Sequence, residues 1–383
     1  MKKRRLKILT SFIIPGLFSY ALYYHFYYKG GIGEYSRQTI TAQNGVDIFY
    51  GIEDFPKKDY FHHRYWTLIN STFPRNIFAD SRQNALFVNY GNTFDKAVEK
   101  KIPNIFRIDL DTKETKYFSA YFLRAMSAHT DTLLVSPWHE YKIYELDKND
   151  LTVKRHFSTQ TDIYPWETMG IYHDDNKGYI YVSNEINPAL FKYDYATGKL
   201  SGRIIIDNIK YGGSIWSLTT SKTTGRLYVI TYMAGQDLVE IDPDKFEITR
   251  TLDLNIYGLL SLAASTMIID DDNGLLYIQH GGRNSLYEID LETFKIMRTL
   301  EGEVHSRGMI LDKKRNVIYI NSFFYGKVIA LDISSGRQSW ELKIGGKPYG
   351  ITLHEDSLYT NTRAGIIKID LDTVWRDHRS GKI

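Results

Sequence analysis

The feature that most constrains this chain is a repeat of about 40 to 50 residues. Seven times, a short apolar strand with an aromatic or aliphatic centre is followed by a second strand that ends in aspartate. The first strands centre on Phe87, Leu134, Tyr181, Tyr228, Tyr277, Tyr319 and Tyr359, and the second strands end at Asp109, Asp147, Asp194, Asp242, Asp290, Asp332 and Asp370. This period, with several strands per unit, is typical of propeller blades. The sequence therefore predicts an all-β fold, a seven-bladed β-propeller.

The fifth repeat shows how each unit divides into four strands. It predicts strands over Ser265–Ile269, Leu275–Gln279, Ser285–Asp290 and Lys295–Leu300, with a tight turn at Asp271–Gly274. Asn-Gly suits that turn because both residues tolerate a positive φ. The aspartate that ends the third strand recurs in all seven repeats. Repetition at one structural position indicates hydrogen bonding within a turn rather than catalysis.

The last repeat has no convincing fourth strand after Asp370. Tyr65–Ile69 lies just before the first repeat, so we expect this N-terminal strand to complete the last blade and close the ring, which removes open sheet edges. The expected domains are then a linker over residues 30–63, with one hairpin around Val46–Tyr50, the propeller over residues 64–375 and a tail over residues 376–383.

The N-terminus carries a membrane signal. Lys2, Lys3, Arg4 and Arg5 precede an uncharged stretch from Ile8 to Tyr24, and tyrosines cluster at its far end. This pattern predicts a basic tip and signal anchor over residues 1–29, with residues 6–28 in the membrane and the propeller on the non-cytoplasmic, periplasmic side. Two alternatives stay open: a cleaved signal peptide, and a cytosolic protein with an apolar N-terminal tail.

Composition excludes several classes of function. The chain has no cysteine, which rules out disulfides, thiolate metal sites and a cysteine nucleophile. The formal net charge of +3 is too small to indicate a nucleic-acid partner. No phosphate-binding loop, dinucleotide fingerprint or nucleophile elbow follows a strand. The sequence therefore predicts no cofactor and no nucleic-acid binding.

A ligand site is expected where the chain enters the innermost strand of each blade, because these entries share one mouth of the central channel. The entries are rich in cations and aromatic rings. The predicted ligand-binding residues are Arg75, Arg124, Trp166, Trp216, Arg307, Lys347 and Tyr349. Arginine offers paired donors to carboxylate or phosphate, so this set favours an anionic ligand. The alternative is structural: polar filling of a wet channel, with the arginines bonded to carbonyl groups of neighbouring blades.

Catalytic and metal signals are weaker. If the protein is an enzyme, Glu167 or His305 is the candidate base, and Arg124 or Arg307 would hold an anion. A channel-centre metal could draw on Glu167, His139, His280 and His305, but no histidine pair has helical metal-ligand spacing. The sequence therefore predicts no metal site.

The repeats themselves resemble those of a known family. Gly225–Thr231 with Leu238–Asp244, and Gly274–Ile278 with Leu286–Glu292, are similar to the YVTN-type repeats of YncE-like bacterial proteins, and more broadly to quinoprotein-amine-dehydrogenase-type propellers. The literal Tyr-Val-Thr-Asn string is missing, and Tyr181–Asn184 is among the nearest forms. The resemblance implies an exported propeller used for binding, and it carries over no functional residue.

Two functions from different classes are consistent with these observations. The first is a membrane-anchored, noncatalytic binding or scaffold module that presents its channel mouth to an anionic small molecule or a partner protein. The alternative is a lactonase- or lyase-like enzyme that uses the same mouth. The absence of a recognisable catalytic set favours the first.

Overall fold

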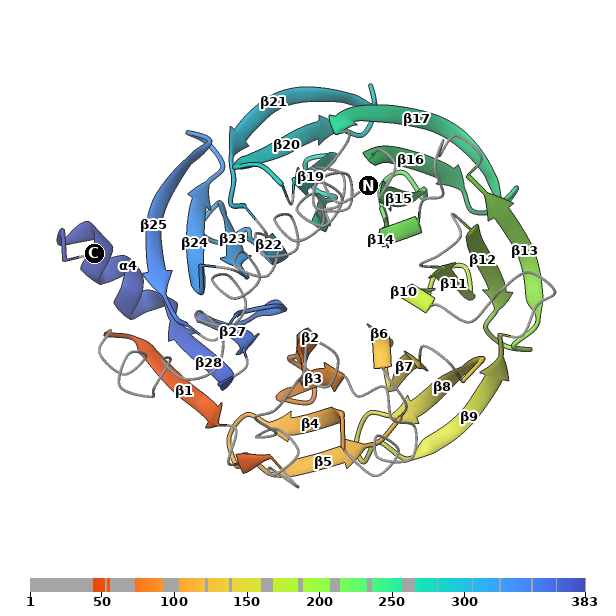
Figure 1. Cartoon of the computed structure of the whole chain (residues 1–383), viewed down its shortest axis with the longest axis horizontal. Coiled ribbons are helices and arrows are strands. Elements are labelled where there is room, and N and C mark those ends of the chain that lie inside the picture. Colours follow the sequence, from red (N-terminus) through yellow and green to blue (C-terminus); the bar gives the residue numbers. More distant parts are fainter. Residues whose placement is uncertain are drawn as a thin grey trace, which may run out of the picture.

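The computed structural model describes residues 44–51, 54–55, 73–91, 103–120, 123–137, 140–159, 168–184, 189–206, 214–232, 236–256, 266–280, 282–304, 306–323, 325–345, 347–362 and 364–382. These residues form seven four-stranded antiparallel sheets arranged in a ring around a central axis (Figure 1). The predicted all-β, seven-bladed propeller is confirmed.

Each sheet places one strand nearest the central axis and three strands progressively further out. The innermost strands are β2 (Phe73–Asp80), β6 (Leu123–Ala128), β10 (Thr168–Asp174), β14 (Ser214–Thr220), β18 (Thr266–Asp270), β22 (Ser306–Asp312) and β26 (Ile351–His354). The second strands are β3 (Ala85–Gly91), β7 (Thr132–Pro137), β11 (Tyr179–Asn184), β15 (Leu227–Tyr232), β19 (Leu275–Gln279), β23 (Val317–Ser322) and β27 (Ser357–Thr362). They contain the seven apolar centres of the repeat.

The third strands each end at the predicted aspartate: β4 (Ile105–Asp109), β8 (Lys142–Asp147), β12 (Ala189–Asp194), β16 (Gln236–Asp242), β20 (Ser285–Asp290), β24 (Lys327–Asp332) and β28 (Gly365–Asp370). In every sheet this aspartate accepts a hydrogen bond from a backbone N–H two or three residues further on. The prediction that these seven aspartates organise turns is confirmed.

The outer strands are β5 (Thr115–Phe118), β9 (Val153–Ser158), β13 (Leu200–Ile205), β17 (Glu247–Ile256), β21 (Lys295–Glu301) and β25 (Arg337–Lys343). In the seventh sheet this position belongs to β1 (Val46–Gly51), which pairs antiparallel with β28. The assignment of this position to Tyr65–Ile69 is therefore wrong, and Tyr65–Ile69 itself lies outside the described residues. The strand comes from the segment expected to be a linker.

The chain after Asp370 forms a helix, α4 (Leu371–Arg379), in place of a further strand. Asp370 caps it by accepting the N–H of Thr373 at 2.7 Å, which satisfies one of the free donors of the first turn. Trp375 packs against Trp340 and donates its indole N–H to the Tyr319 hydroxyl at 2.9 Å. The helix thus seals the junction between the sixth and seventh sheets.

The core consists of seven apolar clusters, one between each pair of neighbouring sheets. The cluster between the seventh and first sheets joins Tyr50 and Phe49 of β1 to Phe106 and Val88. Phe55 lies in this cluster with its ring 4.8 Å from that of Phe106. Because burial of apolar area is the main stabilising contribution, each sheet depends on both of its neighbours.

No helix in the described part of the chain has the length and apolar character needed to cross a membrane. The predicted anchor, residues 6–28, lies outside the described residues.

Candidate functional site

The channel mouth is the end at which the innermost strands begin, and β-bulges interrupt several of these strands there. The pairing register shifts between Pro74 and Ile77 of β2, between Ile215 and Ser217 of β14, and between Ser306 and Met309 of β22. A bulge inserts an unpaired residue and re-aims its side chain, and bulges are over-represented beside active sites. The residues inserted at these three bulges include Arg75, Trp216 and Arg307. A fourth bulge, in β6, holds Arg124.

Six side chains gather at this mouth, and we call them the mouth cluster: Arg75, Trp216, Arg307, Phe323, Lys347 and Tyr349. The guanidinium carbon of Arg307 lies 5.4 Å from the ring centre of Trp216, 5.8 Å from that of Phe323 and 5.8 Å from that of Tyr349. Cation–ring contacts at this distance are attractive. Sheet β18–β21 lies between the sheets of Trp216 and Arg307 in the ring, so their contact joins two sheets that are not neighbours.

Arg75 reaches the same tyrosine from the first sheet. Its Nη1 donates to the Tyr349 hydroxyl at 3.2 Å, and its guanidinium carbon lies 5.5 Å from the ring centre. The Nε of Arg75 is buried and has no hydrogen-bond partner. Tyr349 is thus flanked by two guanidinium groups. Among the described residues, neither arginine forms an ion pair with a carboxylate.

Arginines with a structural role look different in this protein. Arg155, Arg250 and Arg298 stand on outer strands, and each pairs with a buried glutamate of the adjacent third strand. Each also donates to a backbone carbonyl of the next sheet; Arg250, for example, bonds the carbonyls of Glu292 and Leu291 at 2.8 Å. The guanidiniums of Arg75 and Arg307 donate to no backbone carbonyl of the described residues. In this respect they differ from Arg155, Arg250 and Arg298, whose charges are each compensated by a glutamate.

A buried asparagine holds two members of the mouth cluster in place. Asn321 accepts the backbone N–H groups of Arg307 at 3.1 Å and Gly308 at 2.9 Å, and it donates to the carbonyl of Tyr349 at 2.6 Å. Gly308 is required for this close approach, because a Cβ there would lie 2.7 Å from the Tyr349 carbonyl oxygen. The amide of Asn321 thus fixes the sixth sheet against the seventh at the base of the site.

Lys347 enters the cluster from the connection between β25 and β26. Its backbone has a φ of +55°, and it precedes Pro348, which further restricts its conformation. The residue is only 2% exposed, and its Nζ lies 5.8 Å from the ring centre of Phe323. Backbone strain of this kind clusters at ligand sites, where the surrounding structure holds it in place.

The structure brings together five of the predicted ligand-binding residues: Arg75, Trp216, Arg307, Lys347 and Tyr349. Trp166 and the side chain of Arg124 lie outside the described residues, as do Glu167 and His305. The enzyme alternative therefore stays a sequence prediction, and nothing in the described residues favours it.

Sequence reasoning missed Phe323 and Asn321. A signal for Asn321 was present, because a polar residue stands two positions after the apolar centre of the second strand in six repeats, at Asn89, Ser136, Ser183, Gln279, Asn321 and Asn361. All six are fully buried. Gln279, Asn321 and Asn361 use this position to hydrogen-bond backbone groups of neighbouring segments, which is the role expected of a buried amide. Phe323 carries no comparable signal, since it lies in an irregular connection.

Comparison with known proteins identifies the fold and leaves the family open. No protein-family model matches the chain, and no curated protein matches it. Among solved structures it is similar to hydrazine synthase from Kuenenia stuttgartiensis, with a TM-score of 0.64 and 12% sequence identity over 82% of this chain and 99% of that chain. At this identity the likeness shows a shared architecture alone.

Proposed function

We propose that this propeller is a noncatalytic binding module that takes an anionic ligand at its channel mouth. One observation carries the proposal: two arginines from the first and sixth sheets and a lysine from the β25–β26 connection meet on aromatic faces, and the two guanidiniums have no carboxylate partner among the described residues. Like charges held together raise the local positive potential, which a bound anion would relieve.

The donor geometry indicates a carboxylate or phosphate. Each guanidinium presents a planar fork of N–H groups, which matches the paired oxygens of these anions. Trp216 and Phe323 add flat apolar surfaces beside Arg307, which suit a ring or sugar attached to the anion. The ligand class that fits both features is a small phosphorylated or carboxylated molecule with a flat or cyclic body, or a side chain of that kind on a partner protein.

We also propose that the module is exported and tethered to a membrane by residues 6–28, with the propeller on the periplasmic side. The support is the basic cluster followed by the uncharged, tyrosine-flanked stretch. The likeness of the repeats to the YVTN-type repeats of YncE-like proteins supports export as well.

Isothermal titration calorimetry of the full chain with pyrophosphate and with citrate tests anion binding. The R75A/R307A double variant should bind either anion at least about 100-fold more weakly, because each charge-assisted hydrogen bond contributes about 1.5–3 kcal/mol. Fold retention is checked by circular dichroism.

The matched control is R203A/R337A. It removes the same two charges from exposed positions on the outer strands β13 and β25, away from the mouth. Its affinity should stay within about threefold of the parent chain at 0.15 M salt, where long-range effects are screened. Equal losses in both double variants would show that net charge, and not the mouth cluster, determines binding.

A further inference from the structure

A second cluster lies at the opposite end of the innermost strands, between the second and third sheets. His129 follows β6, His173 is part of β10, and Asp175 follows β10 directly. One oxygen of Asp175 lies 3.3 Å from Nε2 of His129 and 3.2 Å from Nδ1 of His173. One ligand atom from each of the three side chains lies within 4.8 Å of the others.

We propose that His129, His173 and Asp175 bind a divalent transition-metal ion, with zinc as the best-fitting example. Tetrahedral zinc with bonds of about 2.0–2.1 Å separates its ligand atoms by about 3.3 Å, which agrees with the two measured distances. Two imidazoles and one carboxylate suit zinc, copper or nickel better than magnesium or calcium, which prefer all-oxygen ligands.

The buried histidine provides independent support. The side chain of His173 is 0% exposed; its Nε2 makes no hydrogen bond, and its Nδ1 faces the Asp175 carboxylate at 3.2 Å without hydrogen-bonding geometry. A buried polar group without a partner is costly, so it marks a place where a ligand is expected.

The aromatic ring of Tyr195 packs against both imidazole rings. The ring of Tyr195 lies 4.2 Å from that of His173 and 5.4 Å from that of His129, and its hydroxyl donates to Glu145 at 2.7 Å. This packing limits rotation of the two imidazoles. Ligands held in this way bind metal without a large loss of side-chain entropy.

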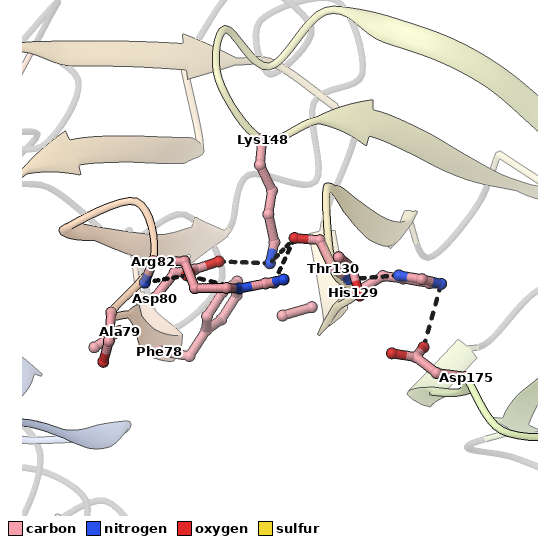
Figure 2. A pocket seen from close by; sticks show the side chains of 10 residues that line it. Phe78, Ala79, Asp80, Arg82, His129, Thr130, Lys148 and Asp175 are labelled. Carbon is pink, nitrogen blue, oxygen red and sulfur yellow. Dashed lines mark hydrogen bonds and ion pairs between the residues drawn. The ribbon is translucent and has the colours of Figure 1, made fainter.

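His129 and Asp175 also line a cavity of about 440 Å³, where the two side chains face each other (Figure 2). The other walls include Asp80, Lys148 and Arg82; Lys148 donates to Asp80 at 2.8 Å, and Arg82 donates to the carbonyl of Thr130 at 2.6 Å. An ion held by three protein ligands keeps a fourth position for water or a small anion, and this position would open to the cavity.

Metal binding requires one local change. The backbone N–H of Thr130 donates to Nδ1 of His129, which places the proton of the neutral ring on Nε2. An ion at Nε2 moves that proton to Nδ1, so the Thr130 N–H must turn away. Thr130 lies in an exposed turn, where water can accept this N–H instead.

Titration of the metal-stripped full chain with Zn²⁺ tests the site. We expect one ion per chain, and at least about 100-fold weaker binding in H129Q and in D175N, since removal of a ligand should exceed the 10–100-fold loss caused by changes around the ligands. H156Q, a change at an exposed histidine of β9, should bind like the parent chain. Co²⁺ provides a measurement that needs no variant, because tetrahedral coordination by the parent chain gives an intense visible absorption band.

Two results would overturn the proposal. One is a parent chain that takes up no Zn²⁺ and gives no tetrahedral Co²⁺ spectrum. The other is zinc affinity in H129Q and D175N equal to that in H156Q. Since the site lies at the other end of the channel from the mouth cluster, both results leave anion binding at the mouth untouched.

Discussion

At the residue scale, burial determines what the histidines of this protein can do. His280 was one candidate for a channel-centre metal, together with Glu167, His139 and His305. It stands directly after β19, 0% exposed, and its Nδ1 accepts the N–H of Gly282 at 2.8 Å. Burial, with the nearby Arg283 second, lowers its pKa to about 4. The other three candidates lie outside the described residues, so this metal stays unsupported, and His280 has a structural role as a neutral acceptor.

This burial predicts a loss of stability in mild acid. In the unfolded chain His280 takes up a proton near its ordinary pKa of 6.5, whereas the folded protein resists protonation down to about pH 4. The unfolded state therefore binds more protons within this window, and the free energy of unfolding falls as the pH falls through it. At 1.36 kcal/mol per pKa unit, the loss is on the order of 3 kcal/mol.

The variant H280N tests this sign and size. Its side-chain oxygen can still accept the Gly282 N–H, but it cannot take up a proton. Urea denaturation at pH 7 and at pH 4 should show a loss of stability about 3 kcal/mol smaller in H280N than in the parent chain. An equal loss in both proteins would mean that His280 is accessible to protons in the folded state.

At this scale, the role of a residue could be predicted from the sequence where the same residue type recurs at the same position of each repeat. The turn aspartates appear in seven repeats, so their common role could be inferred without coordinates. Arg75, Trp216 and Arg307 were found by aligning strand entries, but the bulges that aim them were not visible. A bulge depends on pairing register, which one strand's sequence does not specify.

At the element scale, the main difference between expectation and structure is the outer strand of the seventh sheet. Tyr65–Ile69 was chosen because it immediately precedes the first repeat. The structure uses Val46–Gly51, which buries Phe49 and Tyr50 against the first sheet. Loop-closure entropy grows slowly with length, so a strand further away in sequence costs little more to recruit. Proximity in sequence was therefore a poor guide.

The ladder between β1 and β28 includes one close backbone approach that only glycine allows. Gly365 has a φ of +117°, and a Cβ there would overlap the carbonyl oxygen of Tyr50. In G365A we expect β1 to be displaced. The control is G178A, where φ is +67° but nothing lies within 4 Å of the added Cβ. G178A should lose about 1–2 kcal/mol from backbone strain alone, and G365A should lose roughly 1–3 kcal/mol more from the overlap.

Denaturant unfolding of both variants measures these losses, and hydrogen exchange locates them. Faster exchange confined to residues 46–51 and their partners on β28 is the expected pattern for G365A. Equal destabilisation of the two variants, with β1 still protected, would contradict the role assigned to this strand.

At the scale of the whole molecule, seven similar sheets create two dissimilar channel ends. The positions that all repeats share set the blade geometry, and the positions that differ between repeats set the chemistry. One end gathers cations on aromatic rings, and the other gathers two histidines and an aspartate. The fold could be predicted because periodicity repeats seven times, whereas His129, His173 and Asp175 could not be grouped, since their approach depends on how two sheets pack.

The most direct measurement of the central claim is a crystal structure of the chain grown with selenate, whose anomalous signal locates the anion. We predict a peak within hydrogen-bonding distance of the guanidiniums of both Arg75 and Arg307, and its loss in R75A/R307A. Guanidiniums paired with carboxylates of the protein itself, or selenate bound only away from the mouth cluster, would contradict the account.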